Sequence, residues 1–420
     1  MLLCCAHGLT GCGRDAAGPQ DHPAERSDAV APGPGAAELQ RLRNLGYVDV
    51  VEDERELDAR RAGVEVIDAE RVSPGANLYT QRSAAEAVLM DAQGEVLRRW
   101  RDPQARQWSR ARLLPGGDLV AVGNGYGAGA AAGPEGRRFV VRLGPHGALR
   151  WRRLVRAHHE IQPLPNGRLA TLTMDRRRLP EVGGDVPVRD DYIQLLGPDG
   201  TLGERASLYE LLTSGPHAVP IQPVAPSDGR SGDVVDLVHA NSLVPFDAER
   251  LRSLVGTHPI YADSSLLVTS RHQDVIAVVD WKRREVIHAW GRGVVSGPHD
   301  ATWLENGHWL VFDNGLGRGW SRVLEVDPLD GDIVWEYRAP EATDFYTAAR
   351  GSAQRLPNGN TLITHSGAGE AFEVDAAGEP VWRFLNPARN PRGKRWALGR
   401  MYRYPPDFLA RNLGIEVREP

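Results

Sequence analysis

Cysteine is nearly absent from this sequence of 420 residues. The three cysteines, Cys4, Cys5 and Cys12, lie within the first twelve positions, and no cysteine follows them. A domain built from the rest of the chain therefore cannot be held together by disulfide bonds or by cysteine-ligated zinc. Its stability must come from a hydrophobic core, which a chain of this length is long enough to bury.

The sequence also lacks long apolar runs, an excess of positive charge and a nucleotide-binding motif. No apolar stretch reaches the roughly 18 residues that a membrane-spanning helix requires. The 50 basic and 55 acidic residues leave a net charge of −5, which provides no basic surface for nucleic acid. There is no Walker motif, and the glycine-rich stretch GNGYGAGA at 123–130 precedes a strand-like sequence, whereas a dinucleotide fingerprint opens a helix. Nucleic-acid and nucleotide partners are therefore not expected.

Residues 1–61 differ in composition from the rest and are predicted to lie outside the main domain. The tetrapeptide LTGC at 9–12 is similar to a bacterial lipobox, in which the cysteine is lipidated after signal cleavage. Residues 13–36 have the composition of a flexible tether, and 36–51 has the leucine spacing of a short amphipathic helix. We expect a periplasmic or extracellular protein, anchored to a bacterial membrane through lipidated Cys12; a disordered start is the alternative.

From residue 62 to the C-terminus, short strands separated by glycine turns recur. Four opening segments place the turn residue seven positions after their first residue: SRARLLPGG from 109, HEIQPLPNG from 159, HDATWLENG from 299 and GSAQRLPNG from 351. Six closing segments each combine a turn with a strand, most of them rich in aromatic residues: AQGEVLRRW, PHGALRWRR, PDGTLGERA, WKRREVIHAW, LDGDIVWEY and AAGEPVWRF. A repeat of about 40–50 residues with four strands is typical of a β-propeller blade. We predict an all-β, six-bladed β-propeller over residues 62–420, whose first unit has a degenerate opening strand.

The first strand of every propeller blade lines the central channel, so equivalent positions on these strands form a ring. In this ring the sequence places His159, His239 and His299 on three consecutive blades, with Ser109 and Gly351 on the flanking blades. A requirement of the fold would apply to all six blades, whereas a pocket needs reactive groups on one side and space on the other. The three imidazoles are therefore predicted to meet at one site in a solvated channel.

Two further residues are candidates for the same site. Arg271 ends the second strand of the His239 blade, and its planar guanidinium suits the binding of an oxyanion. Asn241 follows His239 by two positions, so strand alternation predicts that it faces the same side. Glu160 and Asp300 directly follow histidines and are expected to point the opposite way and connect blades. Other nearby histidines, including His272, are expected to face elsewhere.

Several segments of the chain resemble the bacterial aryl-sulfate sulfotransferases, the arylsulfotransferase family. These segments are AHHEIQPLPNG, VHANSL, LVTSRHQDVIAVVDW, GPHDATWLENG with LVFDNG, and SRVLEVDPLDGDIVWEY, and the resemblance covers roughly residues 150–410. It implies a six-bladed propeller that moves a sulfuryl group from an aryl sulfate ester to a phenol without an adenosine-phosphosulfate cofactor. It also implies that His299 is the histidine that becomes transiently sulfurylated.

The remaining site residues match further motifs of the family. His239 and Asn241 match its HxN motif, Arg271 matches the arginine of its SSR motif, and His159 matches a histidine of its HHD motif. The chemistry needs such groups, because sulfuryl transfer, like phosphoryl transfer, depends on positioning and on stabilising charge at peripheral oxygens. A neutral imidazole can act as the nucleophile, and a second histidine can serve as general acid or base.

The residues leave two alternatives open. His159, His239 and His299 could instead ligate zinc with an open coordination position, as in a metal-dependent propeller lyase or hydrolase. The propeller could also be a non-catalytic binding scaffold. The sequence does not identify the physiological donor and acceptor or the oligomeric state.

Overall fold

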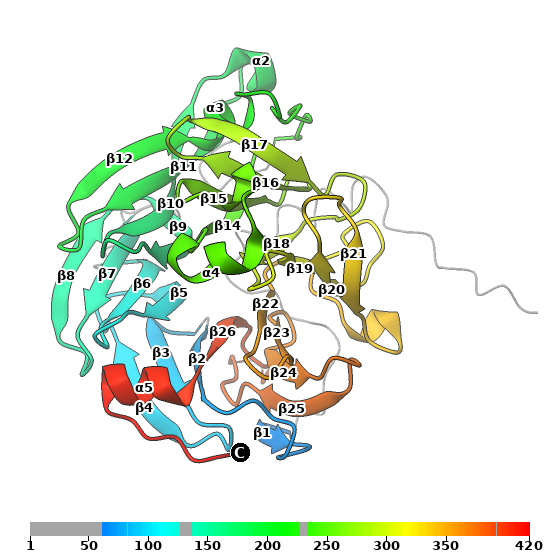
Figure 1. The fold of residues 1–420 in the computed structure, drawn as a ribbon. Helices are drawn as coiled ribbons and strands as arrows, with labels where there is room; N and C mark the ends of the chain where they lie inside the picture. The colour runs from blue at the N-terminus through cyan, green and yellow to red at the C-terminus, as the bar shows by residue number, and fades with distance from the viewer. Residues whose placement is uncertain (1–60, 82, 127–136, 227–232, 392) are drawn as a thin grey trace, which may run out of the picture. The chain divides into compact units, whose positions relative to one another are not determined.

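The computed structural model describes residues 61–81, 83–126, 137–226, 233–391 and 393–420, which form six antiparallel β-sheets. The innermost strands of neighbouring sheets contact one another in sequence order, and the last sheet contacts the first. The sheets are therefore the blades of a closed ring (Figure 1). The predicted six-bladed β-propeller is confirmed.

Each blade contains four strands in the order inner to outer, and blades 3 and 6 have one additional strand. Blade 1 consists of β26 (Leu398–Tyr404), β2 (Ala76–Gln81), β3 (Glu86–Met90) and β4 (Val96–Arg101); blade 2 of β5 (Gln107–Leu113), β6 (Leu119–Asn124), β7 (Phe139–Leu143) and β8 (Leu149–Leu154). Blade 3 consists of β9 (Ala157–Pro163), β10 (Leu169–Arg177), β11 (Val188–Leu196) and β12 (Leu202–Ser207), with β13 (Val235–Asp236) parallel to β11. Blade 4 consists of β14 (Ala240–Pro245), β15 (Ser265–Ser270), β16 (Val275–Asp280) and β17 (Glu285–Trp290). Blade 5 consists of β18 (His299–Trp303), β19 (Trp309–Asp313), β20 (Arg322–Val326) and β21 (Ile333–Tyr337); blade 6 of β22 (Ser352–Arg355), β23 (Thr361–His365), β24 (Glu370–Val374), β25 (Pro380–Leu385) and β1 (Gly63–Val66).

The ring is closed by strands from both ends of the propeller. β26 pairs with β2 as the inner strand of blade 1, and β1 pairs with β25 as the outer strand of blade 6. The opening strand that looked degenerate in the first unit is thus supplied by the C-terminal segment LGRMYRY. Sequence periodicity missed it because its partner lies more than 300 positions earlier in the chain.

The tryptophans of the closing segments explain why that signature recurs. In five blades an indole Nε1 donates to a backbone carbonyl in an adjacent blade: Trp100 to Gly144, Trp151 to Pro198, Trp290 to Gly331, Trp335 to Ala376 and Trp382 to Ala92. A buried indole N–H needs such a partner. Five of the six blades are therefore connected to the next blade by the same contact, whereas the closing segment PDGTLGERA of blade 3 has no tryptophan to make it.

Short helices lie in the connections between strands and, in the case of α5, after the last strand. They are α2 (Pro180–Gly183), α3 (Leu208–Leu212), α4 (Ala248–Val255), α5 (Pro406–Leu413) and the 3₁₀ turns η2 (Pro259–Tyr261) and η3 (Ala342–Asp344). Within the described ranges, no helix has the length and apolar character required to cross a membrane. The predicted lipidated Cys12, the tether and the amphipathic helix at 36–51 lie outside the described residues.

Candidate functional site

The inner strands of blades 3, 4 and 5 are irregular where they begin. β-bulges interrupt the pairing of β9 with β10, of β14 with β15 and of β18 with β19. His159, His239 and Asp300 have left-handed backbone, with φ of 54°, 48° and 52°. Such backbone costs on the order of 1–3 kcal/mol per residue and concentrates at functional sites, and bulges redirect side chains there.

The irregular strand starts bring the three predicted histidines together. The rings of His159 and His239 stack with centroids 5.3 Å apart, and both lie close enough to His299 for a positive charge on that ring to lower their pKa values. His239 is fully buried and His299 is 3% exposed, whereas His159 is partly exposed. The expected convergence is therefore present, but the expected solvated channel is wrong for His239 and His299, because protein atoms surround them.

His299 is held in one tautomer. Its Nδ1 lies 2.7 Å from Oδ1 of Asn314 and 3.0 Å from the carbonyl oxygen of Gly297. Both partners can only accept, since the Asn314 amide nitrogen donates to the carbonyl oxygens of Thr347 and Arg350. Nδ1 therefore carries the proton and Nε2 carries the lone pair. Asn314 belongs to the LVFDNG segment, but neither spacing nor alternation marked it as a partner of His299.

The protonation state of His299 follows from its surroundings. Burial is the main cause that lowers the pKa of His299 to about 3, and the positive charge of Arg271 lowers it further, against the opposing effect of the Asn314 and Gly297 hydrogen bonds. The imidazole is thus neutral at physiological pH. A neutral ring with a fixed lone pair is the form in which histidine acts as a nucleophile.

Arg271 lies directly after β15 and is fully buried. Its Nη1 donates to Nε2 of His272 at 2.9 Å, and its Nη2 donates to the carbonyl oxygen of Ala348 at 3.0 Å. His272 packs against His239 with ring centroids 4.5 Å apart. The expectation that His272 faces elsewhere is therefore wrong: the turn after β15 directs both Arg271 and His272 into the site.

His239 has an acidic partner that the sequence did not indicate. Its Nδ1 lies 2.7 Å from Oδ2 of Asp236, at the end of the short strand β13. The Nδ1–H···carboxylate contact fixes the tautomer of His239 and directs its Nε2 lone pair away from the acid. Burial, together with the charges of His272 and Arg271, holds the pKa of His239 well below its usual range.

The side chain of Asn241 contacts the backbone next to His299. Its Nδ2 donates to the carbonyl oxygen of Pro298 at 2.8 Å, and its Oδ1 accepts from the N–H of Asp300 at 3.3 Å. A bulge between Ala240 and Ser242 interrupts the strict alternation of this strand. Asn241 is thus positioned to hold the backbone on both sides of His299.

Glu160 and Asp300 connect blades, as expected. Arg110 contacts Glu160 at 2.9 Å and Asp300 at 3.4 Å, and Arg400 contacts the same two carboxylates at 3.0 and 2.5 Å. Arg400 also donates to the carbonyl oxygen of Asn241 at 2.6 Å. This buried ionic cluster joins blades 1, 2, 3, 4 and 5 beside the histidines and fixes the strand starts that carry them.

The alternative of a metal site formed by His159, His239 and His299 is not supported by the arrangement of the described residues. Among the described residues, the group of possible ligands whose donor atoms lie within 4.8 Å of one another is Asp236, His239 and His272; it excludes His159 and His299. In that group Nδ1 of His272 donates to the carbonyl oxygen of Asp236 at 2.5 Å, and Nε2 accepts from Arg271. A cation there would also face the guanidinium of Arg271. The donor set fits a hydrogen-bonded network better than a metal centre.

The lowered histidine pKa values predict an unusual dependence of stability on pH. Below about pH 6.5 the unfolded chain protonates His299, while the folded protein keeps it neutral down to about pH 3. The free energy of unfolding should therefore fall between pH 7 and pH 5, by about 2 kcal/mol for His299. Urea denaturation at both pH values should show that this fall is about 2 kcal/mol smaller in His299→Asn than in the wild type.

The comparison with the variant is needed because Asp300 titrates with the opposite sign. Burial raises the pKa of Asp300 to about 7, so the folded state binds a proton that the unfolded state releases. This contribution increases stability as the pH falls, and it is present in both proteins. An equal fall in wild type and His299→Asn would show that His299 titrates normally.

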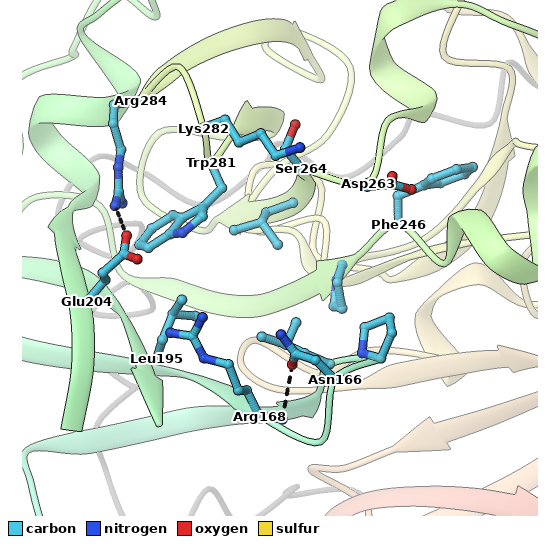
Figure 2. Close-up of a pocket in the computed structure, with 14 residues that line it drawn as sticks. Asn166, Arg168, Leu195, Glu204, Phe246, Asp263, Ser264, Trp281, Lys282 and Arg284 are labelled. Atoms are coloured by element: carbon cyan, nitrogen blue, oxygen red, sulfur yellow. Dashed lines mark hydrogen bonds and ion pairs between the residues drawn. The ribbon is translucent and has the colours of Figure 1, made fainter. Parts of the chain in front are cut away.

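A separate pocket lies at the opposite end of blades 3 and 4. β9 and β14 begin beside the histidines and end at this pocket, a cavity of about 400 Å³. Figure 2 shows Trp281 in its wall and the ion pair between Arg284 and Glu204 at its edge. The Arg284 guanidinium also stacks on the Trp281 ring, 3.6 Å from its centroid. None of the predicted site residues lines this pocket.

A comparison with known protein families shows to which family the chain belongs. Residues 117–387 match the family model described as Arylsulfotransferase (ASST). The chain belongs to the arylsulfotransferase family. Membership in the family indicates aryl sulfotransferase activity in general and implies aryl sulfate and phenol as small-molecule substrates.

The similarity of the chain to individual proteins is lower. No curated protein matches the sequence. Among solved structures, a protein of unknown function from Bacteroides caccae is 12% identical, with a TM-score of 0.47 over 78% of this chain and 98% of that one. A virginiamycin B lyase from Staphylococcus aureus in complex with quinupristin is 12% identical, with a TM-score of 0.43 over 78% and 90% of the two chains. A streptogramin B lyase is 12% identical, with a TM-score of 0.44 over 81% and 97%.

Proposed function

We propose that this arylsulfotransferase transfers the sulfuryl group of an aryl sulfate ester to a phenolic acceptor through a covalent intermediate on His299, without adenosine-phosphosulfate. The observation that supports this most strongly is the state of His299: its Nδ1 proton is fixed by Asn314 and Gly297, and its ring is neutral. A proton held at Nδ1 leaves the Nε2 lone pair as the nucleophile.

In the first step, Nε2 of His299 forms a bond to sulfur while the bond from sulfur to the aryl oxygen breaks. The aryl oxygen keeps the electron pair and takes a proton from a general acid. The resulting sulfo-imidazolium has its Nδ1–H facing the Oδ1 of Asn314, an acceptor that stabilises the positive ring. In the second step a phenol attacks sulfur, loses its proton to the same acid–base group, and the bond to Nε2 breaks.

Of His159 and His239, His239 is the better placed acid–base group. Asp236 orients its ring as the aspartate orients the histidine of a catalytic triad. Its lowered pKa makes it neutral in the substrate-free protein, and the negative charge of a bound sulfate ester raises that pKa. His159 stacks on His239 and, being partly exposed, lies at the edge of the cluster where the aryl group would enter. Arg271 would bind the peripheral oxygens of the sulfuryl group.

The proposal predicts a ping-pong rate law. With 4-nitrophenyl sulfate as donor and phenol as acceptor, and no nucleotide added, double-reciprocal plots at several acceptor concentrations should be parallel. Protein incubated with donor alone and quenched at alkaline pH should carry one acid-labile sulfuryl group on the peptide containing His299, detected by mass spectrometry. Chelator treatment should leave the rate unchanged.

Intersecting plots with no adduct would exclude the covalent route. Loss of activity on chelation together with stoichiometric metal in the purified protein would favour a metal enzyme, and absence of any turnover would favour a binding scaffold. The first result contradicts the covalent intermediate, the second contradicts a mechanism without metal, and the third contradicts catalysis itself.

A further inference from the structure

The connection from blade 5 to blade 6 contacts the site through its backbone. The N–H of Arg350 donates to Nε2 of His299 at 3.1 Å, and the carbonyl oxygen of Ala348 accepts from Nη2 of Arg271 at 3.0 Å. Asn314 holds the same segment by donating to the carbonyl oxygens of Thr347 and Arg350 at 2.7 and 2.8 Å. Residues 347–350 therefore contact the proposed nucleophile, its positioning residue and the proposed oxyanion-binding residue.

The backbone of Arg350 is in a conformation that non-glycine residues rarely adopt. Its φ is 69°, and Gly351 follows with φ of 97°. A Cβ on Gly351 would lie 2.4 Å from Cε1 of Phe312, so this position requires glycine and the chain is forced close to blade 5. This conformation directs the Arg350 N–H at His299, and strained backbone of this kind is often associated with functional sites.

The two backbone contacts occupy positions that a sulfuryl group would need. Nε2 of His299 is the atom that bonds to sulfur in the proposed mechanism, and the Arg350 N–H is its present partner. Arg271 is the proposed ligand of a sulfuryl oxygen, and the Ala348 carbonyl oxygen is one of its present partners. The segment thus makes, in the substrate-free protein, contacts that the transferred group replaces.

We propose that Arg350 is a further sulfuryl-binding residue, which gives up its contact to Nε2 of His299 when substrate binds and then directs its N–H and guanidinium to the oxygens of the transferred group. This inference rests on the proposed function. The guanidinium belongs to the residue whose backbone N–H contacts His299, and its positive charge contributes to the lowered pKa of His299. Sulfuryl transfer places negative charge on three peripheral oxygens, and one guanidinium alone cannot serve them all. Arg350 makes and breaks no covalent bond.

The test compares Arg350→Gln and Arg350→Lys with Arg338→Gln, a control that removes an exposed arginine from the same connection. Two quantities are measured: the rate of adduct formation on His299 in a single turnover with 4-nitrophenyl sulfate, and the inhibition constant of inorganic sulfate. We expect Arg350→Gln to slow adduct formation about 10- to 100-fold and to weaken sulfate inhibition at least about 10-fold. Arg350→Lys should show smaller losses in both, because it keeps the charge but not the planar fork. The control should match the wild type.

The outcomes separate this inference from the proposed function. If the wild type forms the His299 adduct and both Arg350 variants keep its rate and its sulfate inhibition, the role of Arg350 is overturned and the proposed function stands. A slower reaction with unchanged sulfate inhibition would also overturn it, since it would reflect only a displaced backbone. If the wild type forms no adduct, the proposed function fails and this inference fails with it. Should Arg350→Gln not fold, the Arg350→Lys measurements decide alone.

Discussion

Replacing His299 with asparagine is expected to reduce transfer from 4-nitrophenyl sulfate to phenol by a factor on the order of 10⁴ or more, the scale at which loss of a nucleophile acts. The asparagine amide nitrogen can take the place of Nδ1 and donate to Oδ1 of Asn314 and the carbonyl oxygen of Gly297. The lone pair at Nε2 has no counterpart in this variant. The substitution therefore removes the reacting atom while keeping the donor that the fold uses.

Asparagine is preferable to alanine because His299 is almost entirely buried. Alanine would remove the donor to Oδ1 of Asn314 and to the carbonyl oxygen of Gly297, and the loss of a buried partner costs about 1–3 kcal/mol. The matched control is His308→Asn, in the turn of the β18–β19 hairpin, where the ring contacts Glu325. Release of 4-nitrophenol and urea denaturation are measured for both. Turnover of His299→Asn within about tenfold of the wild type would refute the covalent mechanism.

The architecture could be predicted from the sequence because its signals are local. Each glycine turn and each closing tryptophan acts within its own blade or towards the next one, so the repeat is visible without knowledge of distant contacts. The ring position of the inner strands then follows from the repeat alone. For this reason His159, His239, His299 and Arg271 could be grouped before their contacts were known.

The details of the site depend on features that a strict strand pattern cannot represent. A bulge interrupts the alternation at Asn241, and Asn314, which directly follows β19, contacts Nδ1 of His299. Asp236 reaches His239 from the two-residue strand β13, which is too short to give a periodic signal. The burial of His299 depends on a long-range contact with the connection to blade 6, and the inner strand β26 pairs with a strand at the other end of the propeller. Each missed feature is a non-local contact, a local break in alternation or an element too short to give a periodic signal.

Replacing Arg271 with glutamine is expected to lower kcat by about 10²–10³, the usual cost of losing a group that stabilises an oxyanion in the transition state. Glutamine can still donate to the carbonyl oxygen of Ala348 but carries no charge for the sulfuryl oxygens. The control is Arg292→Gln, which also loses guanidinium contacts to carbonyl oxygens, those of Pro220 at 2.8 Å and Gln273 at 3.4 Å, at a residue that has no role in the proposed mechanism. The control should retain wild-type activity.

A series of aryl sulfates with leaving phenols of different acidity separates the role of Arg271 from that of His239. If Arg271 stabilises the peripheral oxygens, its loss lowers kcat by the same factor for every donor, because those oxygens are common to all of them. Loss of a general acid in His239→Asn should instead matter most for the least acidic phenols, which need protonation to leave. Should the Arg271→Gln defect grow as the phenol becomes less acidic, the guanidinium acts on the leaving oxygen and not on the sulfuryl group. A defect that is constant across the series, together with a graded one in His239→Asn, requires two separate sites of charge stabilisation around the sulfur.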